Sequence, residues 1–115
     1  TYTTGDIIGV ALDVTNLKLY FSKNGVWQNS GVPTSGATGT GAISITLGAL
    51  GNFFPAIAYW SGSRATYNTN FGNGYFGTTA VASTNADDAG IGSFEYDVPT
   101  GYYALCTKNI KAYGG

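Results

Sequence analysis

The chain contains few side chains that could carry out acid–base or nucleophilic chemistry. It has no histidine, a single cysteine and six carboxylates. Histidine is the commonest general base and the usual partner of a serine or cysteine nucleophile. Two carboxylates could in principle hydrolyse a glycoside, but two of the six flank an apolar run as turn residues and the others cluster in or near one loop: Asp6, Asp13, Asp87, Asp88, Glu95 and Asp97. The sequence therefore predicts a protein without enzymatic activity.

The acidic stretch "STNADDAG" is the best candidate for a metal site. Asn85, Asp87 and Asp88 could offer oxygen ligands to calcium. A calcium-binding EF-hand loop would require a glutamate six residues after Gly90, where this chain has Tyr96, as well as flanking helices. A solvated acidic loop fits the sequence better, and we expect neither a metal nor a cofactor.

Two further motifs have simple structural interpretations. The stretch "GNGYFG" (72–77) matches the dinucleotide-binding pattern G-x-G-x-x-G, but the residues after it show no helical face on which a pyrophosphate could bind. We predict a glycine-rich turn instead. Cys106 lies in an apolar stretch with no basic neighbour before Lys108, which is typical of a buried, inert thiol.

The positive signal for function is aromatic. Tryptophan and tyrosine near loops that also contain Asn, Ser and Arg suit the binding of protein or sugar. The alternative is that most of these aromatics belong to the core of a sandwich; Trp60 and Arg64 are the pair that we expect to form a recognition loop. The candidate partner-binding residues are Trp27, Trp60, Ser61, Ser63, Arg64, Asn73 and Tyr75.

Apolar and polar residues alternate as in β-strands along much of the chain. Strands are predicted at 7–12, 17–21, 43–47, 53–60 and 64–71, and within 102–110. Turns are predicted at 13–16 and at Asn24-Gly25, and long surface loops at 28–42 and about 77–93. The first strand is apolar or small on both faces, so we expect it to be covered on both sides. No segment has convincing helical periodicity, and antiparallel β-structure is expected throughout.

Composition narrows the class of partner. The 115 residues include 18 glycines and only 10% charged residues, with a net charge of −1. This composition lacks the excess of positive charge that binding to nucleic acid or to an anionic membrane requires. No run approaches the 18 apolar residues of a membrane-spanning helix, and the single cysteine leaves the redox compartment open.

Several of these stretches, in order and spacing, resemble the second half of a SPRY domain. They are "GDIIGVALD", "LKLYFSKNG", "FFPAIAYWSG" and "NTNFG", which cover residues 5–72. The ending "VPTGYYALCTKNI" (98–110) resembles the segment that follows SPRY-like modules in phage and other viral structural proteins. The resemblance implies a bent antiparallel β-sandwich, of the jelly-roll kind, over residues 1–97, and a C-terminal strand or linker over 98–115. The strands that usually precede the Gly5-Asp6 entry, with their Trp-Glu region, do not appear in this sequence.

The resemblance also implies a function. SPRY domains bind protein partners through loops and have no enzymatic activity of their own, and the loops that match here surround Trp27, Ser61 to Arg64, and Asn73 to Tyr75. We therefore expect an interaction module of a phage or viral structural protein, such as a tail, fibre or virion surface protein, located in the virion or outside the cell. Its partner would be another protein or a neighbouring subunit of a larger assembly. The runner-up is a carbohydrate-binding sandwich used in host attachment.

Two expectations concern the core. Six or more strands should form antiparallel pairs, with these residues buried: Leu12, Leu19, Phe21, Ile57, Tyr67 and Phe71. Both faces of the first strand should be buried, and the residues that resemble a SPRY domain begin in the middle of that domain. We therefore also expect that these 115 residues do not fold as an independent unit.

Overall fold

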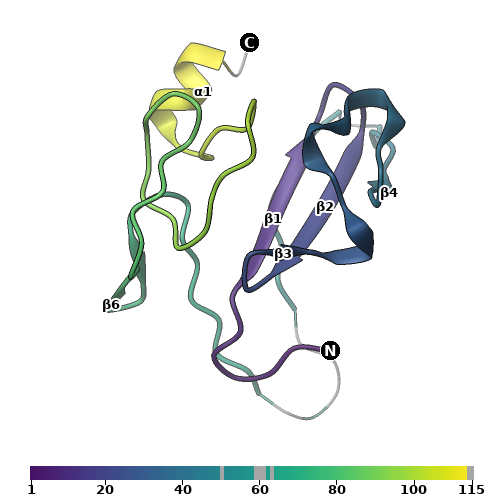
Figure 1. Ribbon diagram of the computed structural model, residues 1–115. Helices are drawn as coiled ribbons and strands as arrows, with labels where there is room; N and C mark the ends of the chain where they lie inside the picture. Colours follow the sequence, from purple (N-terminus) through teal and green to yellow (C-terminus); the bar gives the residue numbers. More distant parts are fainter. Residues whose placement is uncertain (50, 59–61, 63, 114–115) are drawn as a thin grey trace.

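The structure of the chain is a computed structural model that describes residues 1–49, 51–58, 62 and 64–113. Strands and loops dominate, and every strand pairing is antiparallel (Figure 1). The elements are β1 (Ile8–Asp13), β2 (Lys18–Lys23), β3 (Val26–Trp27), η1 (Gln28–Ser30), η2 (Pro33–Thr38), β4 (Ile43–Ser44), β5 (Tyr75–Phe76), β6 (Thr79–Ala80) and α1 (Thr107–Tyr113). The expected antiparallel, mainly-β architecture is confirmed at this level.

The larger sheet is built around the β1–β2 hairpin. β2 lies in the middle, with β1 on one side and with the short strands β3 and β4 on the other. Both predicted turns are confirmed. In the first, the Asp13 carboxylate accepts hydrogen bonds from the backbone and side-chain nitrogens of Asn16, at 2.9 and 2.7 Å. In the second, Asn24 and Gly25 both adopt positive φ, which matches the twist of the strands they connect.

Three predicted strands are not formed. The described residues of 53–60 and 64–71 have no regular secondary structure, and the strand expected within 102–110 is replaced by the helix α1. A strand requires a neighbour to receive its hydrogen bonds, and the described part of the chain supplies none to these segments. The predicted loop at 28–42 contains the two short 3-10 helices η1 and η2.

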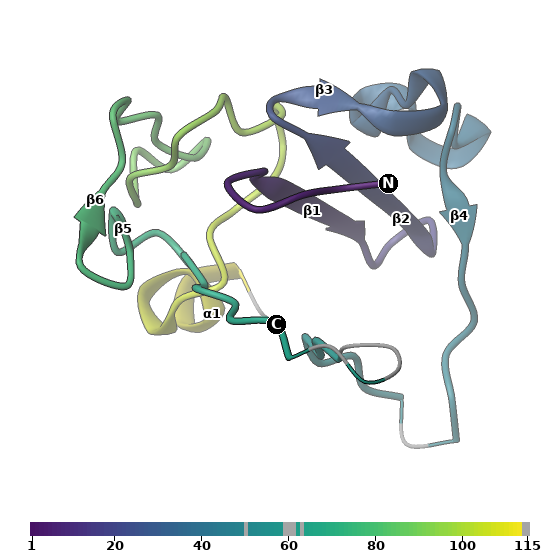
Figure 2. The same ribbon diagram turned by 90° about the horizontal axis from the view of Figure 1, so that it is seen from below.

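The sheet is covered on its less apolar face. The residue pairings assign eight residues to this covered face: Gly9, Ala11, Asp13, Lys18, Tyr20, Ser22, Trp27 and Ser44. Ala11, Tyr20 and Ser22 are buried, and Tyr20 is only 2% exposed. Its ring packs edge-on against Trp27 with centroids 6.4 Å apart, and its hydroxyl lies 3.3 Å from that of Ser35 on η2. Figure 2 shows η1 and η2 stacked on this side of the sheet.

The opposite face, which we call the open face, carries almost only apolar side chains. By the same pairings it consists of Ile8, Val10, Leu12, Leu19, Phe21, Lys23, Val26 and Ile43. Five of these apolar residues are more than a third exposed, and Val10 is 62% exposed. The expectation that β1 is covered on both sides is therefore wrong: the cover lies over the face with the small and polar residues.

The predicted core list is wrong for the same reason. Leu12 and Leu19 are only half-buried, and Phe21 is exposed, because all three belong to the open face. Ile57, Tyr67 and Phe71 are also exposed, because the described residues of their segments form no strand with one face buried in a core. Among the described residues, the buried apolar set consists of Ala11, Tyr20 and Ala104.

The C-terminal part folds around one buried carboxylate. Asp87 is 6% exposed, and its two oxygens accept hydrogen bonds from the backbone nitrogens of Ala89, Ile91 and Ala104 and from the Asn109 side chain, at 2.6–2.9 Å. The predicted solvated loop is therefore wrong for Asp87. This carboxylate connects the loop after β6 to the start of α1, and Tyr102 extends the connection by donating a hydrogen bond to the Pro33 carbonyl.

Candidate interaction site

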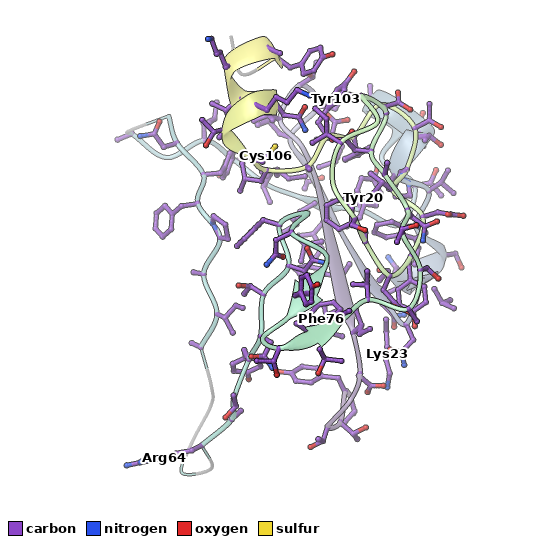
Figure 3. All side chains as sticks on the ribbon, turned by 90° about the vertical axis from the view of Figure 1, so that its left-hand side faces the viewer. Tyr20, Lys23, Arg64, Phe76, Tyr103 and Cys106 are labelled. Atoms are coloured by element: carbon purple, nitrogen blue, oxygen red, sulfur yellow. The ribbon has the colours of Figure 1, made fainter. Side chains whose placement is uncertain are left out.

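The candidate partner-binding residues that the structure describes do not gather in one place. Trp27 lies on β3 of the larger sheet and Tyr75 on β5 of the smaller one, and Figure 2 shows these strands well apart. Arg64 lies at the end of a long excursion of the chain (Figure 3). Trp60, Ser61 and Ser63 lie outside the described residues, so the expected contact between Trp60 and Arg64 stays a prediction.

Trp27 is half-buried and contributes to packing. Its ring contacts Tyr20, as described above, which is the core role that the sequence offered as the alternative for most aromatics. Asn73 and Tyr75 are exposed and remain available to a partner. They lie within the glycine-rich stretch 72–77, where Gly72, Gly74 and Gly77 have positive φ as the turn interpretation requires, although residues 75–76 form the short strand β5.

Arg64 belongs to the stretch 51–71, which we call the extended loop and most of whose described residues are exposed. Phe54 is 82% exposed, and Ile57 and Tyr67 are also exposed. Arg64 itself is exposed and forms no hydrogen bond or ion pair with any described residue. A stretch that combines an arginine with apolar and aromatic residues has the composition typical of protein-recognition surfaces.

Two hollows lie near these surfaces. One, of about 310 Å³, is lined mainly by backbone and apolar atoms between Phe71, Ile91 and Leu105, and includes Cys106. Cys106 is half-buried and precedes α1, so the predicted apolar strand around it is wrong. The other, of about 590 Å³, lies between the Leu12 end of the open face and residues 51–54. Neither brings together a nucleophile and a base.

Asp87, Asp6 and Tyr102 are ionisable groups with clearly shifted pKa values, and their hydrogen bonds and ion pair stabilise the fold. Burial alone would raise the pKa of Asp87, but the hydrogen bonds from Ala104, Ile91, Asn109 and Ala89 outweigh it and hold that pKa below its usual value. Asp6 forms an ion pair of 2.8 Å with Lys23, which together with bonds from Thr3 and Asn24 keeps its pKa low. Burial raises the pKa of Tyr102 to about 12.

The calcium interpretation finds no support in the geometry. Both oxygens of Asp87 are already occupied by hydrogen-bond donors, and Asp88 points elsewhere and accepts a bond from the Gly101 nitrogen at 2.9 Å. Within residues 1–49, 51–58, 62 and 64–113, no three His, Cys, Asp or Glu side chains cluster as metal ligands would. No helix in that part of the chain is long and apolar enough to cross a membrane.

Comparison of this chain with protein-family models finds no match, and comparisons with curated proteins and with solved structures find no significant match. The SPRY resemblance thus stays a prediction based on the residues that suggested it. The surface that the sequence did not predict is the open face. The alternation of Ile8, Val10 and Leu12 identified its residues correctly, but no local signal could indicate which face of the sheet would be covered.

Proposed function

We propose that this chain is a non-enzymatic interaction module that binds a protein partner through the extended loop. The observation that carries the proposal is the exposure of Phe54, Ile57 and Arg64 on a backbone without regular structure. Soluble proteins rarely leave contiguous apolar surface open unless it has a binding role. A mixed apolar and cationic stretch is also what protein binding, rather than sugar binding, predicts.

The setting of this function in a phage or viral structural protein rests on the resemblance of residues 5–72 and 98–110. Tail, fibre and virion surface proteins act through contacts with neighbouring subunits or host proteins, so an interaction module without catalytic groups suits such a particle. In this setting the chain would be found in the virion or outside the cell.

The proposal is tested by comparing what wild-type and variant chains retain. The immobilised chain is exposed to a protein extract of the cells or particles from which its gene comes, and the retained proteins are quantified by mass spectrometry. We expect at least one protein that the wild type retains and that Phe54→Ser and Arg64→Ala each lose. Ile110→Ser, which changes an equally apolar exposed residue on α1, should retain it.

A retained set that is the same for all four chains would contradict the proposal, because the extended loop would then make no specific contact. Circular dichroism of each variant shows whether a loss of binding reflects a loss of folding. The loop variants should keep the wild-type spectrum, since the side chains of Phe54 and Arg64 are both exposed.

Sugar binding is the second candidate, and one observation favours it. Tyr103 and Tyr113 are both exposed and stack with ring centroids 4.4 Å apart and planes 18° from parallel. Sugars bind to exposed aromatic faces, but this pair hides one face of each ring against the other. Binding on a glycan array that Tyr103→Ala abolishes, and that Phe54→Ser leaves unchanged, would favour this function over the first.

A further inference from the structure

The open face and the extended loop lie opposite each other. In Figure 2, η1 and η2 lie above the sheet and residues 51–58 run below it, on the side of the open face; Figure 1 shows the same segment behind β1. Leu12 of the open face and Phe53 and Phe54 of the loop together line the hollow of about 590 Å³. Residues 51–58 therefore occupy the place of a second layer over the sheet, but as one isolated segment.

Among the described residues, none pairs with the backbone of this segment. Residues 52–58 form no hydrogen bond with any described residue, through either backbone or side chain. An elongated backbone with free donors and acceptors is the edge to which another strand can add. Pro55 lacks an N–H, and alternate residues of an extended chain direct their N–H groups to the same edge. The better edge for pairing is thus that of Asn52, Phe54, Ala56 and Ala58.

The face beside this segment requires an uncharged, apolar partner. Lys23 is the only ionisable side chain of the open face, and its charge is compensated by Asp6 at 2.8 Å. The five exposed apolar residues leave roughly 500 Å² open, if a fully exposed residue of this size has about 200 Å²: Ile8, Val10, Phe21, Val26 and Ile43. A strand whose alternate residues are apolar would pair with the segment and cover this area.

We propose that the open face, together with residues 52–58, docks an extended apolar strand supplied by another polypeptide. The strand adds to the Asn52–Ala58 edge and extends the second layer across β2 towards β4, so that its apolar side chains cover Phe21 and Ile43. A second copy of this chain fits less well, because residues 51–58 lie on the open-face side of the sheet (Figure 2) and would stand between two such faces. This inference rests on the proposed protein-binding function and names the kind of partner.

The test uses the whole chain and a defined probe, a capped octapeptide in which valine and threonine alternate. We expect the peptide to bind with a dissociation constant in the micromolar to low millimolar range and to slow amide hydrogen exchange in residues 52–58. Val10→Lys and Ile43→Lys should each weaken binding tenfold or more by placing a charge on the apolar face. Ala56→Pro should weaken it similarly by removing a donor from the pairing edge.

The matched control is Ile110→Lys. Ile43 and Ile110 are 53% and 54% exposed, so the same substitution has the same intrinsic cost, but Ile110 lies on α1. This variant should bind the peptide as the wild type does, and a peptide N-methylated at alternate residues should not bind. The inference is overturned if the peptide does not bind at 1 mM, or if the Val10→Lys and Ile43→Lys variants bind it as the wild type does. It is also overturned if sedimentation shows that two copies of the chain cover the open face as a dimer, and that Val10→Lys dissociates this dimer. Partner capture that depends on Phe54 would still support the proposed function in each of these cases.

Discussion

Asp87 is the residue on which the C-terminal part depends most. Replacing it with alanine removes the acceptor of the buried Ala104 nitrogen and of the half-buried Ile91 nitrogen, and it leaves the Asn109 side-chain nitrogen with the Ala104 carbonyl as its one acceptor. Each unsatisfied buried donor costs about 1–3 kcal/mol. We expect Asp87→Ala to accelerate amide hydrogen exchange at Ile91 and Ala104 by about a hundredfold or more, because about 1.4 kcal/mol corresponds to a factor of ten.

Asp88→Ala is the matched control for that substitution. Asp88 is exposed and accepts one hydrogen bond, from the Gly101 nitrogen. Surface changes of this kind are usually worth less than about 0.5 kcal/mol, so exchange at Ile91 and Ala104 should stay near the wild-type rate. Equal effects of the two substitutions would show that Asp87 is not the centre of this region.

The low pKa of Asp87 has a defined pH dependence. Its folded-state pKa lies below the value of about 3.9 expected for an unfolded chain. The stabilisation it provides is therefore fully present above pH 4 and is lost as the pH falls through the lower, folded-state value. Hydrogen exchange at Ala104, corrected for intrinsic rates, should become faster in the wild type below about pH 4 and should change little in Asp87→Ala. An equally steep acid response in the variant would contradict this assignment.

At the scale of elements, the β2–β3 turn requires a glycine at position 25 for two separate reasons. Gly25 has φ of 79°, and a Cβ atom added there would lie 2.7 Å from Cδ1 of Tyr96. Gly90 also has positive φ, at 70°, but a Cβ atom there would meet nothing within 4 Å. Gly25→Ala therefore combines backbone strain with steric overlap, whereas Gly90→Ala has the strain alone.

Near-ultraviolet circular dichroism reports the packing of Tyr20 and Trp27. On heating, we expect Gly25→Ala to lose this signal at a temperature about 5 °C or more below that at which Gly90→Ala loses it. The physical reason is that the added methyl group displaces the Tyr96 ring from the turn that joins β2 to β3, the strand that carries Trp27. If the two variants lose the near-ultraviolet signal at similar temperatures, the contact between Gly25 and Tyr96 does not stabilise this part of the fold.

The elements that sequence predicted well are those determined locally. The β1–β2 hairpin and the Asn24-Gly25 turn follow from alternation and from residues that tolerate positive φ. The stretch 64–71 alternates as well, and 53–60 is an apolar run, but a strand also requires a neighbour, and sequence does not reveal whether one exists. The helix α1 was missed because seven residues with one buried side chain, Asn109, show no apolar periodicity.

The site was predictable only in part for a similar reason. Arg64 is exposed, as a recognition loop requires, but Trp27 packs against Tyr20 and the described candidates lie on separate elements. The open face escaped prediction because both faces of β1 are apolar or small. Only tertiary packing determined that Ala11 would be buried and Val10 left open.

For the whole molecule, the small buried set and the large open face predict weak cooperativity. With Ala11, Tyr20 and Ala104 as the buried apolar residues of the described chain, burial contributes little against the conformational entropy of 115 residues. Scanning calorimetry of the isolated chain should show a broad transition, and the dye ANS should bind. The double change Val10→Lys with Ile43→Lys should reduce ANS fluorescence several-fold. A sharp transition without dye binding would contradict the open face.

The most direct test of the central claim, that the sheet covers its small and polar face and leaves its apolar face to a partner, is carbene footprinting of the isolated chain with residue-level mass spectrometry. Neighbouring residues of one strand provide the internal control, since Val10 and Ala11 of β1 point to opposite faces, as do Tyr20 and Phe21 of β2. The account predicts strong labelling of Val10, Val26 and Ile43 and protection of Ala11 and Tyr20. Protection of Val10 and Ile43, with labelling of Tyr20, would show that the faces are reversed and would contradict both the open face and the docking of a strand upon it.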